Sequence, residues 1–148
     1  SGIEVDVLDK RPGILSARYA GENATDEENN RKLLKELNGL PITKREASYK
    51  CVIALVFPSG KEETVEGDCR GLISLEPKGN GGFGYDPLFY IPAYVKTMAE
   101  LPPDIKNRIS HRGKALAKLK EKLTAILLSF MPSSQYLKKR YPSGNRGI

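Results

Sequence analysis

The chain has 148 residues, a hydrophobic fraction of 39% and frequent glycine and proline, which together suit a loop-rich α/β protein with one core. Its formal net charge is +6, but lysine and arginine are spread along predicted helices and form no basic stripe among exposed aromatic residues, so we expect no nucleic-acid partner. No apolar run reaches the roughly 18 residues of a membrane span, so we expect no membrane association.

The first predicted elements are a strand, a loop and a helix. Apolar and polar residues alternate from Ile3 to Leu8, which predicts a half-buried strand. A loop begins at Pro12. Thr25 or Asp26 then caps a helix whose leucines share one face, and the helix ends before Pro41.

The middle of the chain predicts an antiparallel hairpin. Alternating apolar residues indicate one strand from Ser48 to Phe57 and a second from Glu63 to Leu75, with the turn Pro58-Ser59-Gly60 between them. Glycines interrupt the second pattern at Gly67 and Gly71. They predict a break or a β-bulge in that strand.

The two cysteines, Cys51 and Cys69, fall in these neighbouring strands. Two cysteines without a signal segment favour a reduced compartment, where both act as small apolar residues. They are also too few for a zinc site. We therefore expect a soluble, cytoplasmic protein without a disulfide.

The carboxy-terminal half predicts helices. Thr97 to Glu100 resembles a capping box at the start of a short helix, and a further helical turn runs from Asp104 to Ile109. A long amphipathic helix follows Ser110, with lysines and Glu121 on one side. Its other side carries Leu116, Leu119, Leu123, Ile126 or Leu127, and Phe130. Residues 131–148 form a polar, basic tail that we expect to be flexible; a partner-binding arm is the alternative.

The most distinctive stretch is the glycine-rich run from Gly79 to Pro87, here called the glycine loop. Four glycines in six residues let the backbone lie against a bound molecule where a Cβ would clash. Phe83 offers a ring on which a flat ligand can stack, and Asp86 a carboxylate for its edge. The alternative is a glycine loop that only turns a corner.

A second cluster, Ser110-His111-Arg112, stands at the start of the long helix, with Lys106 shortly before it. Serine is a favoured N-cap, and unpaired amides at a helix start attract acceptors and anions. His111 and Arg112 add further donors to this small volume. The alternative is an ordinary N-cap followed by two solvated basic residues.

Four segments, in this order, resemble the inosine/xanthosine triphosphate pyrophosphatase family in its bacterial, dITP/XTP pyrophosphatase form. They are Ser1 to Asp6, Pro12 to Gly21, Gly82 to Phe89 and Ser110 to Leu116. The resemblance extends from Ser1 to about Leu123. The Ser-Ala-Arg-Tyr-Ala-Gly run that begins at Ser16 is typical of the bacterial form.

The family's amino-terminal third has no counterpart in this chain. That third carries a Thr-Gly-Asn-x-x-Lys phosphate loop, an acidic metal ligand and an aspartate that would precede Ser1. The resemblance implies that residues 1–130 are the carboxy-terminal part of one domain. It also implies a two-lobed α/β fold with a mixed, elongated sheet flanked by helices and incomplete at the amino terminus. A homodimer or a complementing amino-terminal segment is expected.

The activity that the resemblance implies is hydrolysis of ITP, dITP or XTP to a monophosphate and pyrophosphate, with magnesium. The magnesium ligands are expected mainly in the missing third, and no catalytic or metal-binding residue is assigned in this chain. We therefore expect the isolated chain to be inactive. The alternative is a non-catalytic purine-nucleotide binding module.

Eight residues are expected to contact the nucleotide, the purine nucleoside triphosphate partner of this site. Phe83 would stack on the purine, while His111 and Arg112 would donate to the oxygen at position six of hypoxanthine or xanthine. Asp86 would accept from the base or sugar, or alternatively hold the amides of its loop. The full set is Ser1, Phe83, Gly84, Tyr85, Asp86, Lys106, His111 and Arg112.

Overall fold

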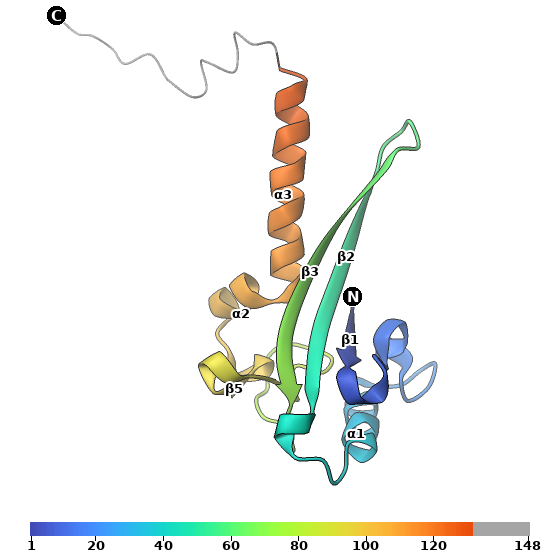
Figure 1. The fold of residues 1–148 in the computed structure, drawn as a ribbon, viewed down its shortest axis with the longest axis vertical. Helices are drawn as coiled ribbons and strands as arrows, with labels where there is room; N and C mark the ends of the chain where they lie inside the picture. The colour runs from blue at the N-terminus through green and yellow to red at the C-terminus, as the bar shows by residue number, and fades with distance from the viewer. Residues whose placement is uncertain (132–148) are drawn as a thin grey trace, which may run out of the picture.

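The structure is a computed structural model that describes residues 1–131. Its strands form one sheet in the order β1-β2-β3-β4-β5, and every pair is antiparallel. The strands are β1 (Gly2–Val5), β2 (Glu46–Val56), β3 (Glu62–Ile73), β4 (Phe89–Ile91) and β5 (Lys96–Thr97). The helices are α1 (Asp26–Glu36), α2 (Pro103–Ile109) and α3 (His111–Ser129). The expected α/β fold is confirmed, and its long hairpin and α3 extend in the same direction (Figure 1).

The β2–β3 hairpin is present as predicted, but the predicted bulge in β3 is wrong. The two strands pair without interruption from Glu46↔Leu72 to Val56↔Glu62. The glycines mark close backbone approaches instead. A Cβ at Gly67 would collide with the carbonyl oxygen of His111, and a Cβ at Gly71 would lie 2.6 Å from the carbonyl oxygen of Tyr90. Glycine at these positions lets α3 and β4 approach β3.

The first strand is shorter than predicted. β1 ends at Val5, and a 3-10 turn covers Asp6–Leu8. Asp9 and Lys10 adopt left-handed backbone angles, with φ of 53° and 68°, and the Lys10 amide bonds back to the Val5 carbonyl. This reversal ends the strand, although the alternation of apolar residues continues.

α1 begins and packs as predicted. Thr25 is its N-cap and forms a capping box with Glu28. Its leucines at positions 33 and 37 are fully buried, in one core with Ile3 and Val5 of β1. This packing places α1 beside β1 and next to the glycine loop.

The carboxy-terminal helices also begin where the sequence predicts. Thr97 and Glu100 form a capping box around a 3-10 turn, and Ser110 caps α3 by accepting from the Gly113 amide at 3.0 Å. The leucine side of α3, however, is only partly covered in the described residues, with Leu119 and Ile126 half-buried. Leu116, Leu127 and Phe130 are 57%, 66% and 81% exposed.

The remaining sequence expectations concern the cysteines, membrane spans and the tail. Cys51 and Cys69 are both buried and unbridged, as expected for small apolar residues. Within residues 1–131, none of the helices has the length and hydropathy of a membrane-crossing segment. The expected basic tail, apart from Met131, lies outside the described residues.

Candidate functional site

A cavity of about 1070 Å³ opens between the glycine loop, the start of the chain and the start of α3. All of the predicted nucleotide contacts line it, although they come from four separate stretches of sequence. They are Ser1, Phe83, Gly84, Tyr85, Asp86, Lys106, His111 and Arg112. The structure therefore brings the glycine loop and the Ser-His-Arg cluster together, and their roles as ligand contacts stay a prediction.

The glycine loop folds tightly around Asp86. Gly79, Gly82 and Gly84 have positive φ angles of 87°, 73° and 62°. A Cβ at Gly82 would collide with Oδ2 of Asp86 and lie 2.8 Å from Nζ of Lys106. Glycine at position 82 thus allows this carboxylate and this ammonium group to meet under the loop.

Phe83 leaves the loop with its ring partly open to solvent, at 53% exposure. Nζ of Lys106 lies 5.0 Å from the ring centroid, and Cζ of Arg112 lies 4.5 Å from it. Both distances are within the range of cation–π contacts. The ring therefore stands in a positively charged part of the cavity, which suits an acceptor-rich or anionic planar ligand.

Asp86 connects the loop to its surroundings. Its side chain is buried, and Oδ2 accepts from Nζ of Lys106 at 2.6 Å and from the Phe83 amide at 3.1 Å. Oδ1 accepts from the Tyr49 hydroxyl at 3.0 Å. The structure thus shows the loop-holding role of Asp86, and a contact from Asp86 to a base or sugar stays a prediction.

His111 is buried in the cavity wall, with its ring stacked on Tyr49 at a centroid distance of 4.6 Å and an angle of 16°. Burial, with a further contribution from Arg112, lowers the pKa of His111 to about 4. The imidazole is therefore neutral at pH 7 and offers one donor and one acceptor. Nδ1 is buried and has no hydrogen-bond partner among the residues that the structure describes.

Arg112 and Ser1 meet at the cavity rim. Nε of Arg112 donates a long hydrogen bond of 3.4 Å to Oγ of Ser1. Tyr85 forms part of the wall: its ring is buried and its hydroxyl donates to the Ser16 carbonyl at 2.7 Å. Burial raises the pKa of Tyr85, so its hydroxyl keeps its proton and acts as a structural donor.

Sequence reasoning missed three residues that hold this site. The Gly84 amide donates to Oδ2 of Asp26 at 2.8 Å, and the Gly84 carbonyl accepts from Nδ2 of Asn30 at 3.1 Å. The start of α1 therefore holds both sides of one loop residue. Tyr49 is the third, through Asp86 and His111. The cap at Thr25 located the start of α1, but no local signal in the sequence connects α1 or β2 to the glycine loop.

The cavity does not offer a ready site for a metal ion. Residues 1–131 contain no group of three or more His, Cys, Asp or Glu side chains that could hold a metal. Of the carboxylates that line the cavity, Asp86 is paired with Lys106 and Asp26 accepts from the Gly84 amide. The described residues therefore do not fit magnesium.

Comparisons with known proteins agree on one family. The model of the Ham1 family matches residues 1–122. The dITP/XTP pyrophosphatase of Geobacter sulfurreducens is 55% identical over 123 residues, which are 83% of this chain and 62% of the relative. That of Desulforamulus reducens is 54% identical over 128 residues, which are 86% of this chain and 64% of the relative. The chain thus spans less than two thirds of the length of these curated relatives.

Solved structures give the same result. The Staphylococcus aureus Ham1 protein matches with a TM-score of 0.80 and 44% identity, over 84% of this chain and 64% of that one. A HAM1 protein from Coxiella burnetii matches with a TM-score of 0.79 and 45% identity, over the same shares of 84% and 64%. At these identities both fold and family are shared.

Proposed function

The chain belongs to the Ham1 family, and we propose that it carries the base-recognition part of a nucleoside triphosphate pyrophosphatase. Its relatives are named dITP/XTP pyrophosphatase. The whole protein then hydrolyses ITP, dITP or XTP to a nucleoside monophosphate and pyrophosphate. Since residues 1–131 contain no group of three or more side chains that could hold a metal, we expect the isolated chain to bind such nucleotides without hydrolysing them.

The observation that supports base binding is the position of the Phe83 ring beside two cations, in a cavity that a buried, neutral imidazole also lines. A purine stacked on Phe83 gains about 1–3 kcal/mol, whichever base it carries. Selectivity must therefore come from groups that meet the edge of the base. Arg112 lies 4.5 Å from the Phe83 ring centroid, and His111 is its neighbour in the chain.

These edge groups favour a base with a carbonyl at position six. Arg112 can only donate hydrogen bonds, and neutral His111 can donate from one ring nitrogen. Hypoxanthine and xanthine present an acceptor oxygen to them, whereas adenine presents an amino group. Arg112 therefore gains a charge-assisted hydrogen bond from this oxygen and none from the adenine amino group, which favours hypoxanthine and xanthine over adenine.

The same proposal includes an assembly that completes the protein. Beyond its pairing with β1, β2 continues from Cys51 to Val56 without a strand on that side in the described residues. The leucine side of α3 is also only partly covered. We expect these surfaces to be covered by a complementing amino-terminal segment or by a second copy of the chain in a homodimer.

The test is a calorimetric titration of the purified chain with ITP and with ATP, without added metal. We expect saturable binding of ITP, at least tenfold tighter than that of ATP, because Arg112 loses its acceptor when adenine replaces hypoxanthine. Phe83→Ala should weaken both nucleotides, since stacking does not depend on the base. Equal affinity for ITP and ATP would refute base recognition by this cavity.

A second measurement separates an enzyme from a binding module. The amino-terminal segment of the Geobacter sulfurreducens relative is expressed separately and added to the chain. Magnesium-dependent release of pyrophosphate from ITP by the mixture, but not by the chain alone, supports the pyrophosphatase. Selective ITP binding without hydrolysis in a formed complex would identify a non-catalytic purine-nucleotide binding module instead.

A further inference from the structure

Tyr49 lies on β2, in the lining of the cavity, and contacts the two clusters that form it. Its side chain is buried at 6% exposure. Its ring packs on Phe89 of β4 at a centroid distance of 4.3 Å and stacks on His111 of α3 at 4.6 Å. Two aromatic neighbours therefore fix the plane of the Tyr49 ring, and the ring in turn supports the imidazole.

The hydroxyl of Tyr49 makes the second contact. It donates to Oδ1 of Asp86, whereas the Phe83 amide and Nζ of Lys106 both bond to Oδ2. Each carboxylate oxygen thus has its own partners, and the Tyr49 bond fixes the rotation of the carboxylate. Without this donor, Oδ1 would be buried with no hydrogen-bond partner among the described residues. This loss would favour rotation of the carboxylate.

The protonation of Tyr49 keeps this bond in one direction. Burial raises the pKa of Tyr49, and the negative charge of Asp86 raises it further. The hydroxyl therefore keeps its proton at neutral pH. It donates to Oδ1 of Asp86, and the carboxylate accepts.

We propose that Tyr49 is a positioning residue for base recognition: its hydroxyl orients the Asp86 carboxylate that holds Phe83 and Lys106, and its ring holds His111 in the cavity wall. This inference rests on the base-recognition function proposed above. One side chain, Tyr49, would then keep the Phe83 ring and the His111 imidazole in place, and it need not touch the nucleotide itself.

The alternative role, a tyrosine that only fills the core, makes different predictions for Tyr49→Phe. This variant keeps the ring and removes one hydroxyl, so a packing role predicts little change. A positioning role predicts that the loop loosens while the fold remains. Tyr19→Phe is the matched control, because the Tyr19 hydroxyl also donates to a carboxylate, that of Glu36, and Tyr19 lies outside the cavity lining.

The first measurement needs no nucleotide. Amide hydrogen exchange is followed by NMR at Phe83, whose amide bonds to Asp86. We expect exchange about tenfold faster in Tyr49→Phe, because the carboxylate that accepts this bond is no longer fixed, and unchanged exchange in Tyr19→Phe. The resonance of His111, the single histidine of the sequence, should stay in place because the stacked ring remains. Unchanged exchange at Phe83 in a folded Tyr49→Phe protein would overturn the positioning role.

The second measurement uses nucleotides. Titration should show both ITP and ATP bound about tenfold more weakly by Tyr49→Phe than by the wild type and Tyr19→Phe, because the loosened loop no longer holds the stacking ring of Phe83. Wild-type affinity for both nucleotides in Tyr49→Phe would overturn the role of Tyr49 in base recognition, even with faster exchange at Phe83. If the wild-type chain shows no preference for ITP, the proposed function fails, and the exchange measurement still decides whether Tyr49 positions the loop.

Discussion

His111 is the single histidine of the chain, and its protonation state determines what the cavity wall offers a ligand. Burial and then Arg112 lower the pKa of His111 from 6.5 to about 4, while Asp86 acts in the opposite direction. In the unfolded chain the imidazole takes up a proton near pH 6.5. Between these values the unfolded state therefore binds more protons than the folded state, and acid favours unfolding.

This difference predicts how stability depends on pH. The free energy of unfolding should fall as the pH is lowered from 6.5 towards 4, by up to about 3 kcal/mol for this shift in the pKa of His111. Three carboxyl groups with lowered pKa values, those of Asp6, Glu63 and Glu100, also make stability depend on pH. They do so at lower pH, because their ordinary pKa values lie at or below 4.5. Urea unfolding followed by circular dichroism at pH 5.0, 6.0 and 7.0 measures the slope. In His111→Gln the free energy of unfolding should depend less on pH. An unchanged dependence in this variant would contradict the role of the lowered His111 pKa.

The residues of the site show what sequence can and cannot predict at this scale. Phe83, Asp86, His111 and Arg112 belong to compact motifs, so their types and spacing identified them. Tyr49 was missed because its role depends on Asp86, which lies 37 residues further along the chain. In the strand pattern a tyrosine on the buried face of β2 looks like any core aromatic residue.

At the scale of elements, α3 lies along the edge of β3 that, beyond its pairing with β4, has no strand beside it within residues 1–131. Three lysines, spaced one helical turn apart, donate to carbonyls of alternate β3 residues. Four helical residues rise about 6 Å and two strand residues about 6.8 Å, so the two spacings match closely enough for three bonds. The pairs are Lys114 with Asp68, Lys118 with Glu66 and Lys122 with Thr64, at 2.8, 2.7 and 3.4 Å.

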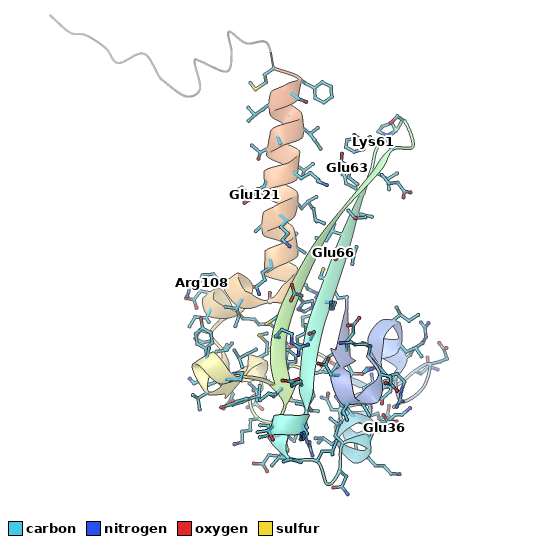
Figure 2. All side chains as sticks on the ribbon, in the orientation of Figure 1. Glu36, Lys61, Glu63, Glu66, Arg108 and Glu121 are labelled. Atoms are coloured by element: carbon cyan, nitrogen blue, oxygen red, sulfur yellow. The ribbon has the colours of Figure 1, made fainter. Side chains whose placement is uncertain are left out.

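These bonds hold the lysines of α3 against the hairpin, while Leu119 and Ile126 of its leucine side are half-buried. Lys122 also forms an ion pair of 3.2 Å with Glu63, and a hydrogen bond from Lys61 lowers the pKa of Glu63. Glu63 and Glu66 lie along the hairpin, whereas Glu121 lies on the side of α3 that faces away from it (Figure 2). Charged side chains on an edge strand also discourage pairing with another chain.

Gly67→Ala tests how closely α3 must approach β3. The added methyl group would collide with the His111 carbonyl oxygen and lie 2.6 Å from the Ala115 amide nitrogen, and both atoms are helix backbone. Because neither can move alone, α3 should shift as a unit and take Arg112 with it. We expect a loss of about 1–3 kcal/mol in urea unfolding and at least tenfold weaker ITP binding.

Glu66→Ala is the control, since Glu66 is exposed, neighbours Gly67 and meets Lys118 only through its backbone carbonyl. Its stability and ITP affinity should match those of the wild type. If Gly67→Ala behaved like this control, the close approach of strand and helix would not determine the site. The sequence located Gly67 but suggested a bulge, because the need for glycine comes from a helix much further along the chain.

At the scale of the whole molecule, the hairpin and α3 extend from the body (Figure 1), and both carry exposed apolar side chains. Val52 and Val56 of β2 are 57% and 60% exposed, and Leu127 of α3 is 66% exposed. Monomeric proteins rarely leave large contiguous apolar patches in water. The amphipathic pattern predicted α3 itself, but helical periodicity does not identify the surface against which an apolar side packs.

These surfaces predict that the isolated chain associates with itself and with a complementing segment through α3. Leu116→Glu combined with Leu127→Glu replaces two exposed leucines, so it should leave folding intact and convert self-associated chain to monomer in sedimentation velocity. The same substitutions should weaken, by tenfold or more, binding of the amino-terminal segment of the Geobacter sulfurreducens relative, because each buries a charge at the contact. Ala117→Glu with Ala125→Glu adds the same charge at exposed positions of the same helix and is the control. A wild-type chain that is monomeric and does not bind the segment would show that the leucine side of α3 is not a docking surface.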